Sequence, residues 1–209
     1  MGMIGQIKLV PAVAGGIQCM PLVQPQRAGG MPLMEALNGR HSEREFAPQA
    51  LDPQTLSNLI WAACGINRIG HQGRTMPSAM NAQEVLLYVA MPQGLYLYVQ
   101  RTHSLQRVID NDVRPLTGNQ EFVDAAPLEL IYVADHSKVK LIAAAQRAAY
   151  ANTSAGAMAQ NVYLYCASAG LATVLRAWLD RDALSKAMGL EQNLQILLSQ
   201  TVGERKGSR

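Results

Sequence analysis

The 209-residue chain is poor in charged and aromatic side chains, which make up 16% and 5% of its residues. The net charge of +3 is small and no block of basic residues is interleaved with aromatic ones, so nucleic acid is not an expected partner. No apolar run reaches the roughly 18 uninterrupted residues of a membrane-spanning helix, so we expect no membrane partner either. The chain does have 49% hydrophobic residues, enough for one globular domain with a substantial core.

Cysteine is scarce as well. The chain has an odd number of cysteines, namely Cys19, Cys64 and Cys166, and no Cys-x-x-Cys pair occurs. This pattern argues against a disulfide framework and against a zinc site, and we predict no metal site. We expect reduced and mostly buried thiols, because free cysteine packs as a small hydrophobic residue.

The first 30 residues lack a regular apolar period, and we predict a loose or domain-draping arm, with ordered structure beginning near Met31. Residues 31–209 then form the single domain. The extreme N-terminus resembles an export signal only weakly, because it has one lysine and is interrupted by Pro11, Gly15 and Gly16. We therefore expect a cytoplasmic protein, with export as the alternative.

Helical spacing and end signals predict several helices. The clearest follows Asp52, which is placed to cap it, has Pro53 at its first position and ends at Gly65. The alanine-rich stretch 140–170 is expected to form two helices that break or bend near 152–154. Shorter helices are predicted over 32–39 and 180–189.

Four segments read as strands: 84–90, 94–99, 127–135 and 194–203. The first two flank a short loop and predict a hairpin, and the third is apolar enough to be central in a sheet. Strands and helices do not alternate regularly, and neither common glycine-rich nucleotide-binding motif occurs. The predicted fold class is therefore α+β, with a mixed, mostly antiparallel sheet flanked by helices.

A cluster of polar residues follows the first predicted helix. Arg40, Ser42 and Arg44 alternate, so in an extended segment all three point to one side while His41 and Glu43 point to the other. Arginine and serine together are suitable donors to a phosphate dianion. The alternative is a solvated loop in which the arginines pair with nearby glutamates.

Three further stretches could contact a ligand. The turn at 77–83 has small residues for close approach and the side-chain amides of Asn81 and Gln83. The segment 170–180 could present a backbone N–H group to a ring nitrogen, and the chain ends in a basic tail after Gly203. Taken alone, these stretches are better explained as a polar turn, a buried connecting strand and a frayed terminus.

Together and in this order, these stretches resemble the nitroreductase family of FMN flavoproteins, especially its branch of azoline-oxidase and dehydrogenase-like members. The resemblance runs from about residue 31 to the end of the chain. It is carried by Arg40-x-Ser42-x-Arg44-x-Phe46, Arg74-Thr75-x-Pro77-Ser78-Ala79 and Thr201-Val202-Gly203, supported by segments 59–68 and 159–174.

The resemblance implies an intertwined homodimer with FMN at the subunit interface. No side chain need act as a general acid or base, so no catalytic side chain is predicted. The cofactor-binding residues that it implies are Arg40, His41, Ser42 and Arg44 at the phosphate and ribityl chain, Ser78 and Asn81 along the flavin, Leu175, Arg176 and Ala177 near N5 through their backbone, and Lys206 at the phosphate.

The activity implied is that of an FMN-dependent oxidoreductase. NAD(P)H would reduce the flavin by hydride transfer to N5, and the electrons would pass to a small nitroaromatic- or quinone-like acceptor in a ping-pong cycle. The alternatives are a flavin-dependent oxidase or dehydrogenase of an organic substrate and a non-catalytic FMN-binding protein.

Overall fold

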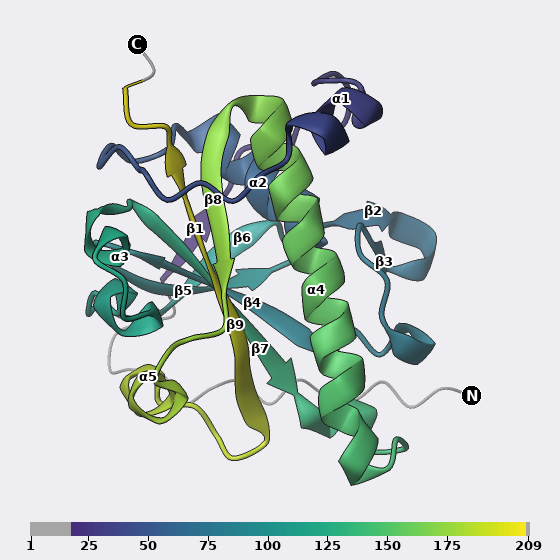
Figure 1. Cartoon of the computed structure of the whole chain (residues 1–209). Coiled ribbons are helices and arrows are strands. Elements are labelled where there is room, and N and C mark those ends of the chain that lie inside the picture. The colour runs from purple at the N-terminus through teal and green to yellow at the C-terminus, as the bar shows by residue number, and fades with distance from the viewer. Residues whose placement is uncertain (1–17, 208–209) are drawn as a thin grey trace.

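The computed structural model describes residues 18–207, and its centre is a seven-stranded sheet (Figure 1). The strands lie in the order β1-β6-β5-β4-β7-β9-β8, and each neighbouring pair is antiparallel. Their bounds are β1 Cys19–Pro21, β4 Val85–Met91, β5 Gly94–Val99, β6 Ser104–Ile109, β7 Leu128–Asp135, β8 Leu171–Arg176 and β9 Leu194–Glu204. A separate hairpin pairs β2 (Ile66–Arg68) with β3 (Gly73–Arg74).

The four predicted strands are confirmed as β4, β5, β7 and β9. The β4–β5 hairpin turns tightly, because Met91 pairs with Gly94, and β7 lies between β4 and β9 as a central strand. Strand β6 lies in a segment for which the sequence predicted no element. Its side chains are mostly half-buried and include Gln106 and Arg107, so it lacks a strong apolar alternation.

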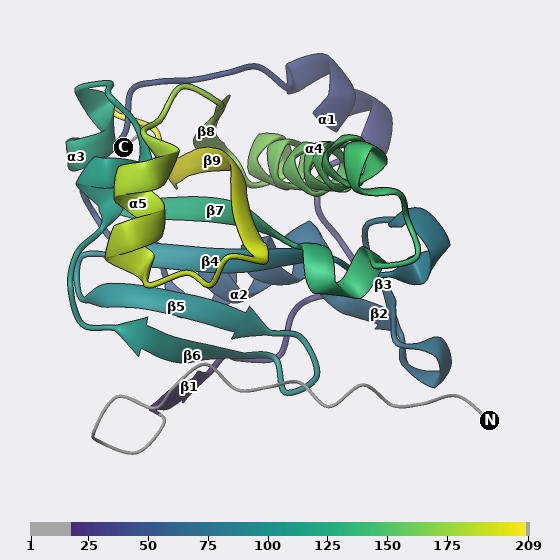
Figure 2. The ribbon, with the colours of Figure 1, turned by 90° about the horizontal axis from the view of Figure 1, so that it is seen from below.

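Helices cover both faces of the sheet (Figure 2). One core lies under α2 (Pro53–Cys64) and α4 (Ala144–Ala169), and a second lies under α5 (Arg181–Met188). Alternation along β7 supplies both, since Leu130 and Tyr132 join the first core while Ile131 and Val133 join the second. The remaining helical elements are α1 Leu33–Gly39, α3 Phe122–Ala125 and the 3-10 turns η1 Ile69–His71, η2 Ala79–Asn81, η3 Arg114–Thr117 and η4 His136–Val139.

The predicted helix ends are confirmed for α2 and α5. The Asp52 carboxylate accepts the N–H groups of Gln54 and Thr55 at 2.9 and 3.0 Å, which satisfies donors that lack a partner within the helix. Asp180 accepts the Ala183 N–H in the same way at 3.0 Å. Gly189 ends α5 with φ +63°, a left-handed conformation that favours glycine.

The predicted break in the alanine-rich helix is wrong, because α4 is continuous over 26 residues. The polar side chains that suggested a break are all used without interrupting the helix. Asn152 and Thr153 donate to carbonyls one turn back, at 2.8 and 2.9 Å, and Ser154 donates to the buried carboxylate of Glu84 at 2.6 Å.

Among residues 18–207, no helix has both the length and the apolar character needed to cross a membrane.

The prediction that ordered structure begins near Met31 is also wrong. Strand β1 pairs with β6 from Cys19 to Pro21, and the chain then crosses α2. Gln26 N–H donates to the Asn58 side chain at 2.8 Å, and Met31 N–H donates to Ser168 at the end of α4 at 2.8 Å. The described part of the arm therefore drapes over the domain, while residues 1–17, including the possible export signal, lie outside the described residues.

The cysteines are free thiols. Cys64 and Cys166 are buried, as expected, whereas Cys19 on the edge strand β1 is exposed. Burial raises the pKa of both the Cys64 and Cys166 thiols, because the thiolate is poorly solvated in the core. The two buried cysteines are therefore structural rather than reactive groups.

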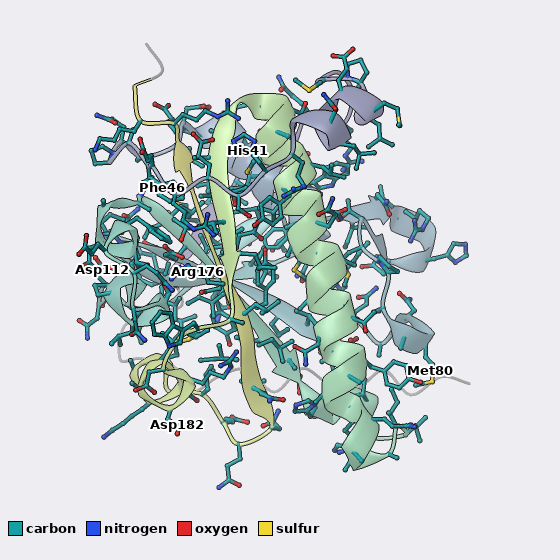
Figure 3. All side chains as sticks on the ribbon, viewed as in Figure 1. His41, Phe46, Met80, Asp112, Arg176 and Asp182 are labelled. Carbon is teal, nitrogen blue, oxygen red and sulfur yellow. The ribbon has the colours of Figure 1, made fainter. Side chains whose placement is uncertain are left out.

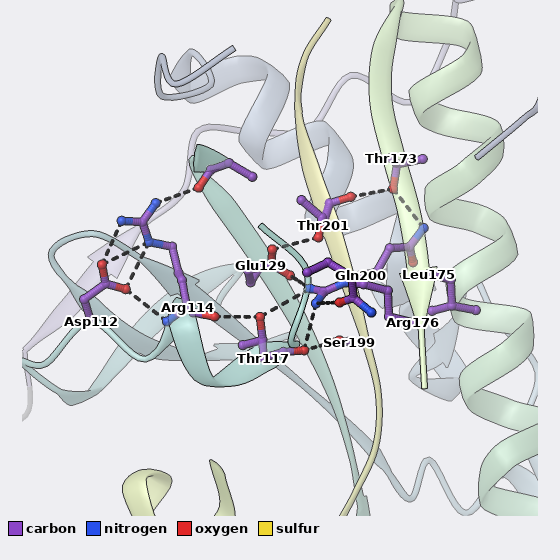
Figure 4. Close-up of polar contacts among 12 residues, drawn as sticks. Asp112, Arg114, Thr117, Glu129, Thr173, Leu175, Arg176, Ser199, Gln200 and Thr201 are labelled. Carbon is purple, nitrogen blue, oxygen red and sulfur yellow. Dashed lines mark hydrogen bonds and ion pairs between the residues drawn. The ribbon is translucent and has the colours of Figure 1, made fainter. Parts of the chain in front are cut away.

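A buried ion pair ties three strands to the η3 turn (Figure 4). Arg176 at the end of β8 is 6% exposed and donates to the fully buried Glu129 of β7 at 2.5 Å and to the Thr117 carbonyl at 3.0 Å. The same carboxylate accepts from Thr201 of β9 at 2.7 Å. A Cβ at Gly118 would lie 1.7 Å from the guanidinium, so this approach requires glycine.

The charges of this pair depend on one another. Burial raises the pKa of Glu129, and the positive charge of Arg176 opposes that rise. Burial lowers the pKa of Arg176, and Glu129 opposes that fall. Removal of either partner would leave a buried charge uncompensated.

We predict that Arg176→Ala lowers the free energy of unfolding by about 3–5 kcal/mol at pH 8, because Glu129 is left charged and unpaired. The deficit relative to wild type should shrink at pH 6. Without Arg176 the folded-state pKa of Glu129 rises further above its unfolded value, so stability is lost as pH rises through that range. Denaturant unfolding at both pH values measures the difference.

The Arg176→Ala/Glu129→Gln double variant is the control, because glutamine has no charge to titrate. Its deficit should not grow from pH 6 to pH 8, because the only carboxyl of the pair has been removed. A single variant whose deficit also fails to grow over this range would contradict the uncompensated-charge explanation.

Candidate functional site

The polar segment after α1 lies along the open edge of the sheet. Glu43 N–H donates to the Thr173 carbonyl of β8 at 3.0 Å, and Ala47 N–H donates to the Glu204 carbonyl of β9 at 2.9 Å. Phe46 forms a β-bridge with Arg205. The segment is therefore extended, and its side chains alternate between two sides as the sequence predicts.

Arg40 and Ser42 converge on one buried tyrosine of α4. The Arg40 guanidinium lies 5.2 Å from the centre of the Tyr163 ring, and the Ser42 hydroxyl is 2.8 Å from the Tyr163 hydroxyl. The same tyrosine oxygen accepts the backbone N–H of Leu175 in β8 at 2.9 Å. Tyr163 thus joins the polar segment, α4 and the edge strand.

His41 and Glu43 form a separate cluster. The His41 ring is 3.3 Å from the Glu43 carboxylate, and that carboxylate is 3.1 Å from the guanidinium of Arg205. The Glu43 carboxylate is therefore paired with Arg205 and lies beside the His41 ring. Arg44 and Lys206 have exposed side chains, and Lys206 N–H donates to the Glu45 carbonyl at 3.3 Å, which places the tail backbone beside the segment.

Leu175, Arg176 and Ala177 were predicted to present backbone N–H groups to the flavin, but not all three N–H groups are available for this. Leu175 N–H is used by Tyr163, and the Arg176 side chain lies on the opposite face of the sheet, in the buried ion pair. In an extended chain every second N–H points to the same edge, so Ala177 carries the next donor beyond Leu175 on that edge. Ala177 is exposed.

The turn that carries Ser78 and Asn81 has an unusual backbone. Met80, Asn81 and Gln83 have φ of 53°, 52° and 52°, in the left-handed region that non-glycine residues rarely adopt. The turn is held by the Ser78 hydroxyl, which accepts the Gln83 N–H at 2.9 Å. Such strain is often found at ligand-binding sites.

The tip of this turn lies toward the start of α4, whereas Thr75, just before it, accepts a hydrogen bond from Asn161, two residues from Tyr163. Met80 lines a surface cavity of about 240 Å³ with Leu141, Gln146 and Tyr150, near the start of α4. Tyr150 and Tyr163 are 13 residues apart, which is about 20 Å along a helix. In Figure 3, His41 and Met80 lie near opposite ends of α4. Among residues 18–207, no hydrogen bond or ion pair links Ser78 or Asn81 to Arg40 or Ser42, so the two predicted groups of cofactor residues do not contact each other within one chain.

The residues around Tyr163 fit the phosphate of FMN. Arg40 and Ser42 supply a guanidinium and a hydroxyl at one place, and the carboxylate of Glu43, the residue between Ser42 and Arg44, is paired with Arg205. Charge-assisted donors of this kind match phosphate oxygens. Ser42 is exposed and Arg40 half-buried, so an anion can approach them from solvent.

Sequence reasoning missed Tyr163 and the Glu43–Arg205 pair. Tyr163 belongs to a correctly predicted helical stretch that also contains Tyr165, and nothing in the local sequence distinguishes the two. The predicted alternation placed Glu43 on the side opposite Arg40 and Ser42, but it did not identify Arg205 as the partner of Glu43. The position of the tail, which brings Arg205 to Glu43, depends on the register of β9.

Comparison with known proteins points to one family. A model of the nitroreductase family matches residues 37–204. A nitroreductase-family protein of Methanocaldococcus jannaschii is 31% identical over 153 residues, covering 68% of this chain and 76% of that protein. The solved structure of a nitroreductase-family protein of Ralstonia eutropha has a TM-score of 0.88 and 42% identity, and the match covers 100% of this chain and 97% of that one.

The fold extends to more distant proteins. A chain of the E. coli microcin synthetase complex has a TM-score of 0.69 at 19% identity, covering 88% of this chain and 77% of its own, which shows a shared fold. The family model and the relative from Methanocaldococcus jannaschii go further than fold. By both, the chain belongs to the nitroreductase family.

Proposed function

We propose that the protein is an FMN-dependent oxidoreductase that uses NAD(P)H and reduces a small organic acceptor, nitroaromatic- or quinone-like in character. When bound, FMN supplies the two-electron chemistry, taking a hydride from NAD(P)H at N5 and passing electrons to the acceptor in a ping-pong cycle. The protein binds the cofactor, orients it and supplies hydrogen bonds at its polar edge.

The observation that carries this proposal is the convergence of Arg40 and Ser42 on Tyr163 beside β8. Thr173, which contacts Glu43, and Ala177 are four residues apart, or about 13 Å along an extended strand. An extended mononucleotide has a comparable length. A phosphate at Arg40 and Ser42 would therefore allow the flavin edge to meet the Ala177 N–H.

The remaining residues have assigned roles in the same proposal. His41 and Arg44 lie in the phosphate-binding segment, and Lys206 adds positive charge from the tail. Leu175 and Arg176 shape the strand that leads to Ala177. Because Ser78 and Asn81 make no contact with Arg40 or Ser42 in one chain, they would contact the flavin whose phosphate is held by Arg40 and Ser42 of a second copy, which requires a homodimer.

The spectrum of the purified protein tests the function directly. We expect flavin absorbance bands that NADH or NADPH bleaches under anaerobic conditions and that a nitroaromatic or quinone acceptor restores. A colourless protein to which added FMN does not bind would overturn the proposal. Bound FMN that is bleached only by an organic substrate would indicate an oxidase or dehydrogenase, and FMN that no donor bleaches would indicate a non-catalytic binding protein.

We predict that Arg40→Ala weakens FMN binding about 10- to 150-fold, the loss expected for one charge-assisted hydrogen bond to phosphate. Equilibrium dialysis of the purified holoprotein gives the dissociation constant. Arg107→Ala is a matched control. Arg107 of β6 lies over the ring of Tyr96 in β5 at the same 5.2 Å, but it lies outside the proposed phosphate site. Equal affinities of the two variants would refute the phosphate assignment of Arg40.

We predict an obligate homodimer with α4 at its interface. The outward side of this helix carries small exposed residues such as Ala145, Ala149 and Gly156, which permit close helix approach, and Leu33 and Met34 on the neighbouring α1 are exposed. Sedimentation at micromolar concentration should give twice the 22.6 kDa of one chain.

Gly156→Trp tests the interface itself. A Cβ at Gly156 meets nothing within 4 Å in the isolated chain, so the tryptophan causes no clash within one chain and any loss of the dimer is due to the interface. Gly70→Trp is the control, because Gly70 is equally open but lies outside α4. A wild-type mass of one chain, or a Gly156→Trp variant that remains dimeric, would contradict this interface.

A further inference from the structure

We propose that Tyr163 is a positioning residue that orients the Ser42 hydroxyl toward the FMN phosphate and fixes Arg40 beside it. The inference rests on the proposed function and adds a residue to it. Tyr163 is 8% exposed and joins three separate elements: the segment after α1, the helix α4 and the edge strand β8. No phosphate contact by Tyr163 itself is required.

The directions of the hydrogen bonds give the tyrosine its role. The Tyr163 oxygen accepts the Leu175 N–H at 2.9 Å, which leaves its single proton available for the Ser42 oxygen at 2.8 Å. When Ser42 accepts that proton, its own hydroxyl hydrogen is free to point to an external acceptor. An anion at this place favours that direction, because it needs donors, and hydrogen bonds in such a chain strengthen one another.

The face of the same ring holds the second donor. The Arg40 guanidinium lies 5.2 Å from the ring centre, at a distance typical of a cation–π contact. One buried side chain thus limits the freedom of both donors before the ligand arrives. Ordering that precedes binding lowers the entropy lost on binding, so it appears as affinity for the cofactor.

Tyr165, a second tyrosine on the same helix, makes a contact that is structural only. Tyr165 donates its hydroxyl to the Thr55 carbonyl of α2 at 3.3 Å and is half-buried. It links two helices and touches none of the groups assigned to the phosphate. The two tyrosines therefore provide a matched pair for experiment, each with one hydroxyl that phenylalanine would remove.

The test measures FMN affinity of purified holoproteins by dialysis, together with the FMN release rate after dilution, followed by the fluorescence of free FMN. Tyr163→Phe should weaken FMN binding about 3- to 10-fold, as expected for the loss of one orienting hydrogen bond, mainly through faster release. Tyr165→Phe should bind as wild type. Denaturant unfolding of both variants shows whether a loss of stability accompanies the change.

A double-mutant cycle separates positioning from packing. If Tyr163 acts through Ser42, then Tyr163→Phe should cost little or no affinity in a Ser42→Ala background. An unchanged affinity in the single variant, or a loss of the same size in the Ser42→Ala background, would overturn the inference while leaving FMN binding intact. A wild-type protein that binds no FMN would instead overturn the proposed function and this inference with it.

Discussion

The candidate site depends on which groups form hydrogen bonds with the backbone along the outer edge of β8. Strand β8 is the last in the sheet, so one row of its backbone N–H and C=O groups has no partner strand. Two groups fill part of that row: Glu43 N–H binds the Thr173 carbonyl, and the Tyr163 hydroxyl takes the Leu175 N–H. These two bonds place the polar segment, and with it Arg40 and Ser42, against the sheet.

The two faces of β8 serve different purposes. Leu175 packs against the core under α2 and α4, next to the tyrosine that organises the polar segment. Arg176, the following residue, enters the opposite face and holds the η3 turn through Glu129 and Thr117. The position of the strand end is thus fixed by a buried ion pair, which leaves the edge itself available for a ligand.

Much of the fold could be predicted because its signals are local. Strand alternation, the Asp52 and Asp180 caps and the left-handed Gly189 depend on a few neighbouring residues. The break predicted within α4 failed because Ser154 bonds to Glu84, a contact 70 residues away in sequence. Strand β1 was missed for a similar reason, since three residues become a strand only by pairing with β6.

In the candidate site, too, local features could be predicted from the sequence and features that depend on distant contacts could not. The alternation of Arg40, Ser42 and Arg44 is a local property, and for the first two it correctly indicated a shared side. Tyr163 could not be found in this way, because its role arises from Ser42, 121 positions earlier, and from Leu175 in another element. Likewise, the place of the Ser78–Asn81 turn depends on distant contacts, such as the hydrogen bond between Thr75 and Asn161 of α4, which are 86 positions apart.

The short strand β1 has a consequence for how the protein behaves when shortened. It lies at the edge of the sheet opposite β8 and covers part of β6, and the Gln18 carbonyl extends that cover by accepting the Arg107 N–H at 2.9 Å. The part of the chain that matches the family model begins only at residue 37. A protein that began at residue 37 would keep its predicted cofactor residues but would expose the outer edge of β6, and an unpaired strand edge can pair with another chain. The described part of the arm therefore protects this edge from aggregation.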